Sequence, residues 1–193
     1  MLDKEIIMRL SKLKYAELEG SLQEWVLNEF SLAETNLIVG KNASGKTRTL
    51  NVIGGLARHL AGVKPIPLSG NYSVEFIKDQ QKIHYHLKYE DQQVITEKYE
   101  IDGKVLLDRG EGGKGTIWAE ELGQGIHFQT PITELAAVAR QDSIQHRFLE
   151  PLHSWASSVG HYYFGTSLGK EDLAILLKKD GTKPNQQKPE NLV

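Results

Sequence analysis

The sequence predicts an α/β domain, and three patterns within its 193 residues carry that prediction. A short β-branched run from Leu37 to Val39 is typical of a strand that is buried on both faces. The apolar residues from Thr47 to Ala61 recur with the period of a helix. From residue 70 to residue 109, apolar and polar side chains alternate, as they do in antiparallel strands. We therefore expect a strand, a helix and an antiparallel β layer, in that order.

The elements before residue 66 are predicted in more detail from the same patterns. Residues 6–18 and 25–32 predict two half-buried strands, and Gly20-Ser21 marks a turn between them. The helix at 47–61 is expected to bury one apolar stripe, formed by Leu50, Ile53, Ala57, Leu60 and Ala61. Gly62 and Pro65 provide the stop signal after this helix.

The alternating zone predicts a meander of antiparallel strands. Asp102-Gly103 is a strong signal for a two-residue hairpin turn, and Tyr85, Leu87 and Tyr89 are expected near the centre of the sheet. Residues 131–159 then have helical spacing, with a break or kink at Pro151. We therefore divide the chain into a lobe at 1–169 and a polar C-terminal tail, or truncated continuation, at 170–193.

Composition excludes several classes of protein. The chain has no cysteine, which excludes disulfides, thiolate metal sites and a cysteine nucleophile. Its formal net charge is −2, so no overall field attracts nucleic acid, although a local basic patch stays open. No apolar run approaches the ~18 residues of a membrane span, and the N-terminus lacks the basic start of a signal peptide. These features predict a cytoplasmic protein without membrane contact.

Residues 40–47 carry the strongest functional signal in the sequence. The octapeptide Gly-Lys-Asn-Ala-Ser-Gly-Lys-Thr matches the Walker A pattern G-x-x-x-x-G-K-[ST], which binds phosphate. The predicted strand enters this segment and the predicted helix leaves it, which is the context that the motif requires. We call residues 40–47 the phosphate loop. The candidate nucleotide-binding residues, including the one that follows the loop, are Gly40, Lys41, Asn42, Ala43, Ser44, Gly45, Lys46, Thr47 and Arg48.

Each part of the phosphate loop has an expected role. Gly40 and Gly45 allow backbone conformations that a Cβ disfavours. The N–H groups from Asn42 to Thr47 form a nest for an anion at the positive end of the helix dipole. Lys46 places its charge on the β- and γ-phosphates, which makes it a candidate catalytic residue. The Thr47 hydroxyl is an oxygen ligand for Mg²⁺.

The phosphate loop, with Asn-Ala-Ser in its interior, resembles that of ABC-type ATPases related to the structural-maintenance-of-chromosomes and overcoming-lysogenization-defect proteins. The opening strand, the meander and the segment at 134–159 are similar to the corresponding parts of these proteins. The resemblance implies a P-loop NTPase fold, in the form of an ABC-ATPase-like N-terminal lobe, that binds ATP and Mg²⁺. It makes Gln141 the candidate Q-loop glutamine, a catalytic residue and metal ligand near the attacking water. It also implies a homodimer of the full-length protein in its ATP-bound state.

Two further motifs of this family are missing from the sequence. No apolar run that ends in Asp-Glu follows Thr47, so no Walker B motif is found, and neither is a Leu-Ser-Gly-Gly signature. We therefore expect the N-terminal portion of an ATPase, which binds ATP but hydrolyses it negligibly by itself. Two alternatives stay open: a nucleotide-binding regulatory module that never hydrolyses ATP, and a kinase that transfers the γ-phosphate to a small acceptor.

Two weaker patterns are interpreted as ordinary surface. His84 and His86 are two residues apart on a predicted strand, but no third metal ligand is near them in the sequence, so a solvated strand face is favoured over a metal site. Lys12, Lys14, Arg48 and Arg58 are interspersed with acidic residues and predict a mixed surface, not a nucleic-acid interface.

Overall fold

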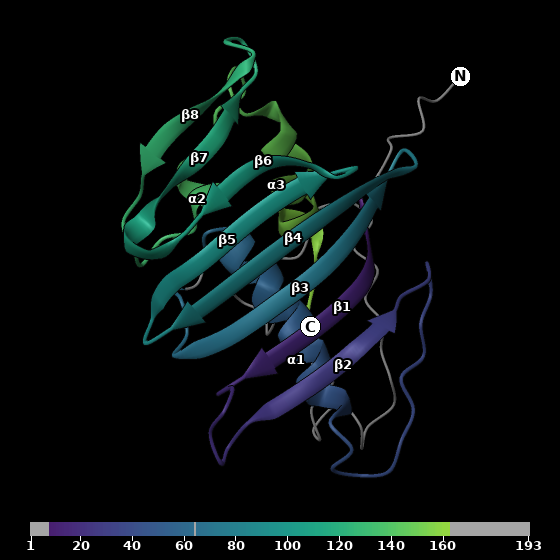
Figure 1. Ribbon diagram of the computed structural model, residues 1–193. Helices are drawn as coiled ribbons and strands as arrows, with labels where there is room; N and C mark the ends of the chain where they lie inside the picture. Colours follow the sequence, from purple (N-terminus) through teal and green to yellow (C-terminus); the bar gives the residue numbers. More distant parts are fainter. Residues whose placement is uncertain (1–7, 64, 163–193) are drawn as a thin grey trace, which may run out of the picture. The chain divides into compact units, whose positions relative to one another are not determined.

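The computed structural model describes residues 8–63 and 65–162, so the predicted tail at 170–193 lies outside the described residues. The chain divides after Ser157 into two units, and the sheet with helices α1 and α2 belongs to the first. Among the described residues, eight strands form one sheet in the order β2-β1-β3-β4-β5-β6-β7-β8 (Figure 1). The strands are β1 (Arg9–Glu17), β2 (Trp25–Ser31), β3 (Ser69–Lys78), β4 (Gln81–Glu90), β5 (Gln93–Ile101), β6 (Lys104–Arg109), β7 (Lys114–Ala119) and β8 (Gln124–Gln129). The helices are α1 (Lys46–Leu60), α2 (Ala136–Ala139) and α3 (Glu150–Ser158), and 3₁₀ turns lie at Glu111–Gly113 and Arg147–Leu149.

The predicted α/β P-loop NTPase fold is wrong. Every pair of neighbouring strands in the described sheet is antiparallel, so the fold is mainly β with few helices. The run from Leu37 to Val39, expected to be a buried strand, forms no strand, and its side chains are 86%, 36% and 77% exposed. A strand needs a neighbour for its backbone hydrogen bonds. Strand β1, which could have been this neighbour, is already paired with β2 on one edge and with β3 on the other.

The meander between residues 70 and 109 is confirmed as antiparallel. Strand β4 is fourth in the sheet order, and its residues Tyr85, Leu87 and Tyr89 are almost fully buried. Asp102 and Gly103 form the predicted two-residue turn, with φ values of 47° and 85°. The turns at Asp79-Gln80 and Asp91-Gln92 use the same left-handed pair without a glycine. Left-handed pairs of this kind match the twist of the strands that they join.

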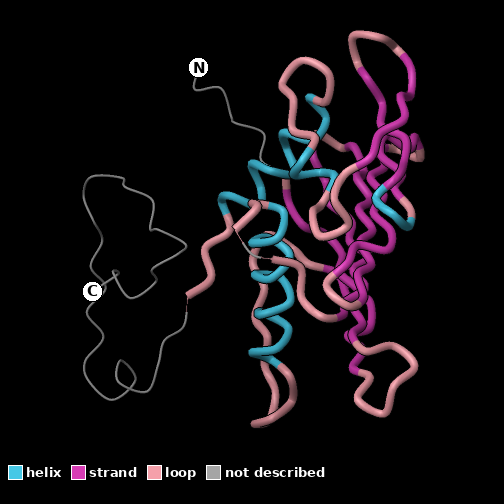
Figure 2. The backbone as a smooth tube through the Cα atoms, turned by 90° about the vertical axis from the view of Figure 1, so that its left-hand side faces the viewer, coloured by secondary structure: helices cyan, strands magenta, loops and turns pink. Residues whose placement is uncertain are grey.

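Helix α1 lies along one face of the sheet (Figure 2). Its buried side chains include Val52, Leu56 and Leu60, whereas Leu50 of the predicted stripe is 46% exposed. The Tyr72 hydroxyl on β3 donates to the carbonyl oxygen of Val52, at 3.2 Å. The prediction of a helix here is therefore confirmed, and Ala57 and Leu60 of the predicted stripe are buried. The buried face also includes Val52 and Leu56, so it is rotated from the one expected.

The segment that follows β8 is less helical than predicted. It contains only α2, one 3₁₀ turn and α3 between residues 131 and 158. Pro151 causes no kink within a helix, because α3 begins at Glu150 and a proline is tolerated in the first turn. Trp155 of α3 packs edge-on against Phe76 of β3, with ring centroids 4.7 Å apart. This segment and α1 supply the apolar cover of the sheet.

Candidate functional site

The phosphate loop follows the exposed run at 37–39, and its last two residues, Lys46 and Thr47, are the first two of α1. Two of its residues, Ala43 and Gly45, have left-handed backbones, with φ values of 63° and 88°. The Ser44 N–H, between them, donates to the carbonyl oxygen of Lys41 at 3.3 Å. Alternation of right- and left-handed residues is typical of nests whose N–H groups converge on an anion.

The two glycines of the phosphate loop have different roles. Gly45 needs its left-handed backbone, and it is also the N-cap of α1. Gly40 does not have a positive φ; a Cβ there would lie 2.6 Å from the Ser44 Oγ. A side chain at position 40 would therefore require the Ser44 hydroxyl to turn away. The second residue with an unusual conformation is instead Ala43, whose Cβ makes the left-handed region costly by about 1 kcal/mol.

The loop is wrapped around the ammonium group of Lys46. The Lys46 Nζ donates to the carbonyl oxygens of Gly40 and Lys41, both at 2.7 Å. Its contact with the Ser44 Oγ is long, at 3.5 Å. An ammonium group has three donors, and the one in the long contact with Ser44 can turn to an anion at little cost. The loop therefore holds a positive charge at the centre of its own curve.

The N-terminus of α1 lies at the phosphate loop and has no side-chain cap. Among the described residues, no side chain caps this helix and its first turn contains no acidic residue. The first backbone bond of the helix is that of Thr49, whose N–H donates to the Gly45 carbonyl oxygen at 2.9 Å. The N–H groups of the preceding residues, including the exposed Thr47, therefore have no intrahelical partner and add the positive end of the helix dipole.

Seven of the nine predicted nucleotide-binding residues line one hollow of about 780 Å³. Its lining consists of Trp25 together with Asn42, Ala43, Ser44, Gly45, Lys46, Thr47 and Arg48. Gly40 and Lys41 contribute through their carbonyl oxygens to Lys46. No acidic side chain belongs to this lining, within the part of the chain that the structure describes. The hollow has the chemistry of an anion site.

Two residues that contact Arg48, Glu17 and Trp25, were not predicted as part of this site. Arg48 pairs with Glu17 of β1 and stacks on Trp25 of β2, with the guanidinium carbon 4.1 Å from the ring centroid. Neither partner lies in the motif, and both were expected only as residues of half-buried strands. The position of Trp25 on an edge strand, next in space to α1, depends on the pairing of β1 with β2, which no local pattern gives.

Gln141 lies in a different hollow, of about 310 Å³, together with Asp142, His146, Glu150 and His153. A Cβ on Gly62, two residues after the end of α1, would lie 3.3 Å from Val138 of α2, so α2 is next to the C-terminal end of α1. The phosphate loop is at the other end of this 15-residue helix, which is about 22 Å long. The structure therefore does not bring Gln141 to Thr47.

The described residues contain no group of three or more His, Asp or Glu side chains arranged to hold a metal ion. His84 lies instead 3.8 Å from Glu75, which is also bonded to Ser11 and Lys12.

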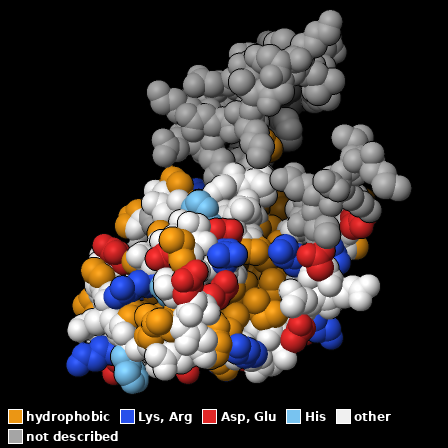
Figure 3. All heavy atoms as spheres, turned by 90° about the horizontal axis from the view of Figure 1, so that it is seen from above, with side chains coloured by type: hydrophobic (Ala, Val, Ile, Leu, Met, Phe, Trp, Pro, Cys, Tyr) orange, Lys and Arg blue, Asp and Glu red, His pale blue; other side chains and the backbone are white. Residues whose placement is uncertain are grey.

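On the face seen in Figure 3, positive and negative side chains are mixed. None of the described helices is long and apolar enough to cross a membrane.

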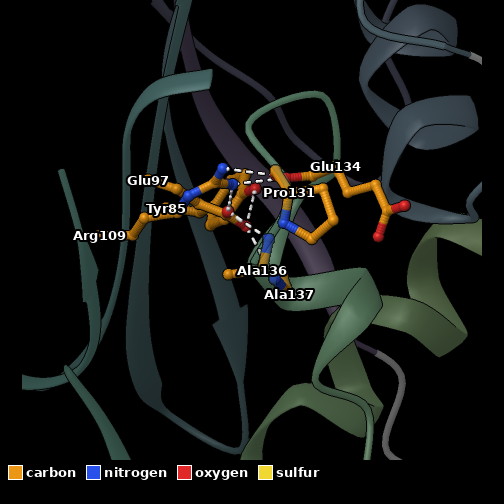
Figure 4. Close-up of polar contacts among 7 residues, drawn as sticks. All are labelled: Tyr85, Glu97, Arg109, Pro131, Glu134, Ala136 and Ala137. Atoms are coloured by element: carbon orange, nitrogen blue, oxygen red, sulfur yellow. Dashed lines mark hydrogen bonds and ion pairs between the residues drawn. The ribbon is translucent and has the colours of Figure 1, made fainter. Parts of the chain in front are cut away.

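A second polar cluster is buried beneath residues 131–137 (Figure 4). Glu97 of β5 and Arg109 of β6 are directly opposite in the strand register, and both are 0% exposed. The Arg109 Nη1 lies 3.5 Å from the Glu97 Oε2. We call these two residues and the groups that they bind the Glu97–Arg109 cluster. No pattern in the sequence indicates this ion pair.

The cluster holds the chain segment that crosses it. Glu97 accepts hydrogen bonds from the N–H groups of Ala136 and Ala137, at 2.6 and 2.9 Å, and from the Tyr85 hydroxyl at 2.9 Å. Arg109 donates to the carbonyl oxygens of Pro131 and Glu134. Burial raises the pKa of Glu97, while these N–H donors oppose the rise. Because its groups are inaccessible and used internally, this cluster is structural.

Comparison of the chain with protein-family models, with curated proteins and with solved structures finds no match in any of the three. The case for function therefore depends on the geometry of the phosphate loop itself.

Proposed function

We propose that residues 40–48 bind the phosphate groups of a magnesium nucleotide, with ATP as the representative ligand. One observation carries this proposal: the loop curls around the Lys46 ammonium at the uncapped N-terminus of α1. Converging backbone N–H groups, a fixed cation and a helix dipole all favour negative charge at the same point. Glu17 is the nearest acidic side chain with a described contact to the loop region, and its charge is neutralised by Arg48.

Each group has a distinct part in this proposal. The N–H groups between Asn42 and Thr47 bind the phosphate oxygens, and Lys46 neutralises the β- and γ-phosphates. The exposed hydroxyl of Thr47 is available to Mg²⁺, which carries its remaining ligands as water and phosphate oxygens. The proposal concerns binding, because no acidic side chain of the described residues lines the hollow to activate a water molecule.

Calorimetric titration of the whole chain with Mg-ATP tests this function. We expect saturable binding, and we expect Lys46→Ala to weaken it by about tenfold or more, because a hydrogen bond to a charged group contributes about 1.5–3 kcal/mol. Lys82→Ala is the matched control, since Lys82 lies on the hairpin at the start of β4, away from the loop. A folded chain that gives no heat, or a Lys46→Ala variant that binds as the wild type does, would contradict the proposal.

A further inference from the structure

One aromatic side chain lies against the phosphate loop. Trp25, the first residue of β2, lines the same hollow as residues 42–48. Its Cζ2 atom is 4.0 Å from the position that a Cβ on Gly45 would take. The indole ring is therefore beside the place where the proposed function puts the phosphates, within reach of whatever group they carry.

Arg48 covers this ring with a flat cation. Its guanidinium carbon is 4.1 Å from the ring centroid of Trp25, and its Nη2 pairs with the Oε1 of Glu17. The other oxygen of Glu17 accepts a hydrogen bond from the Tyr15 hydroxyl, at 3.0 Å. Glu17 therefore fixes the guanidinium at its edge and Trp25 fixes it from one side. The Arg48 side chain is still 46% exposed, and it lines the hollow.

We propose that Trp25 and Arg48 form the platform on which the base of the bound nucleotide stacks. This inference rests on the proposed function and extends it from the phosphates to the rest of the ligand. Indole rings and guanidinium planes both stack on nucleobases, and the guanidinium does so best when its orientation is already fixed. The ligand class that this site takes is then a nucleoside triphosphate, not an inorganic polyphosphate.

The platform also predicts which nucleobases the site accepts. Stacking tolerates any base, because every base has a π face. No hydrogen-bonding group around Trp25 and Arg48 is needed for it, so ATP and GTP are expected to bind with similar affinity. Pyrimidine nucleotides offer a smaller ring to the platform and bind more weakly.

Titration of the whole chain with two probes, Mg-ATP and Mg-tripolyphosphate, separates the base from the phosphates. We expect the wild type to bind Mg-ATP about tenfold more tightly, since stacking of one base contributes about 1–3 kcal/mol. Trp25→Leu removes the ring and is expected to reduce this preference at least fivefold, because the affinity for Mg-ATP falls more than the affinity for tripolyphosphate does. Arg48→Lys keeps the charge but loses the plane, and it reduces the preference in the same direction.

The control uses a second stacked pair in the same molecule. Lys104 lies 3.6 Å from the ring centroid of Trp118 on β7, away from the phosphate loop. Trp118→Leu is expected to leave the affinities for both probes unchanged. If Trp25→Leu does not fold, as judged by circular dichroism, Arg48→Lys carries the test.

The outcomes distinguish the two proposals. Equal affinity of the wild type for both probes overturns the platform while phosphate binding stands. An equal loss of both probes in Trp25→Leu also overturns it, because the ring then supports only the loop. Binding of neither probe by a folded wild-type chain refutes the proposed function, and the platform falls with it.

Discussion

The phosphate loop and the Glu97–Arg109 cluster place charged side chains against backbone groups in opposite ways. In the cluster, a carboxylate meets the N–H groups of Ala136 and Ala137, and both charges are 0% exposed. In the loop, Lys46 meets two carbonyl oxygens, but the neighbouring N–H groups of the helix start have no capping side chain. One site uses its polar groups to hold the fold together. The other leaves donors available, which is what a ligand requires.

The difference is one of cost as well as of access. Removing water from a charged pair is expensive and is offset only by a nearly complete set of hydrogen bonds. The cluster comes close to this. Among the described residues, the Arg109 Nε is the one buried side-chain atom of the cluster that has no hydrogen-bond partner. The exposed loop keeps its water and has no such requirement. Substitutions in the cluster should therefore change stability, and those in the loop should change binding.

Glu97→Gln tests the structural half of this contrast and should have the largest effect. The substitution leaves the buried Arg109 without a counter-charge, which destabilises a protein by about 3–5 kcal/mol. Urea-induced unfolding measures this loss. Glu100→Gln on the same strand is the control, because Glu100 pairs with the half-exposed Lys98. A loss below about 1 kcal/mol for Glu97→Gln would show that the pair is dispensable.

A double substitution sharpens the same point. Replacing a buried ion pair by apolar residues often restores stability. Here Glu97→Leu combined with Arg109→Met should remain destabilised, because the N–H groups and carbonyl oxygens of residues 131–137 lose their partners. Full recovery of the wild-type unfolding midpoint would contradict this account of the cluster.

Gly45→Ala should act mainly on the loop. Alanine at a φ of 88° costs about 1–2 kcal/mol, and relief of this strain would displace the N–H groups of the nest. We expect Mg-ATP binding to weaken at least about fivefold by calorimetry. Gly103→Ala is the matched control, with a φ of 85° in a hairpin turn and open space around it. It should lose comparable stability and keep the affinity of the wild type.

His86 belongs to neither site, and it should make the stability of the fold depend on pH. Burial lowers its pKa below the ordinary value of 6.5, so the folded protein binds a proton less readily than the unfolded chain does. The stability that its neutral form provides is complete above that ordinary value and is lost as the pH falls through the lowered pKa. Unfolding measured from pH 7.5 downward should show this loss, and His86→Gln should flatten it. An unchanged slope in the variant would rule out His86 as its source.

Ala43→Gly should have the smallest effect. It removes the Cβ from a left-handed position, with a φ of 63°, but it also adds freedom to the unfolded chain. We expect stability to change by less than about 0.5 kcal/mol and Mg-ATP affinity by less than about twofold. A large loss of affinity by calorimetry would mean that the Ala43 methyl group itself supports the loop.

Local patterns predicted much of the sheet and the position of the loop. The alternation around Tyr85 and the Asp102-Gly103 turn are properties of neighbouring residues, and both were predicted correctly. The predicted fold class was wrong because the run at 37–39 could form a strand only beside a partner strand. The spacing of residues in the sequence does not show that this partner is missing. Glu97 looks like any charged residue of the exposed strand face. Its burial follows from the long-range contacts of residues 131–137, which the sequence does not show.

The spacing of the strands along the chain also determines the order in which the molecule gains structure. From β3 to β6, each strand follows its neighbour through a turn of two residues, so these contacts form with little loss of loop entropy. Strand β1 pairs with β3 only after the chain has closed the excursion through residues 18–68, which contains β2, the phosphate loop and α1. We therefore expect the meander to form before the loop is completed. A ligand on the loop would slow the unfolding of the finished protein and leave the early steps of its folding unchanged.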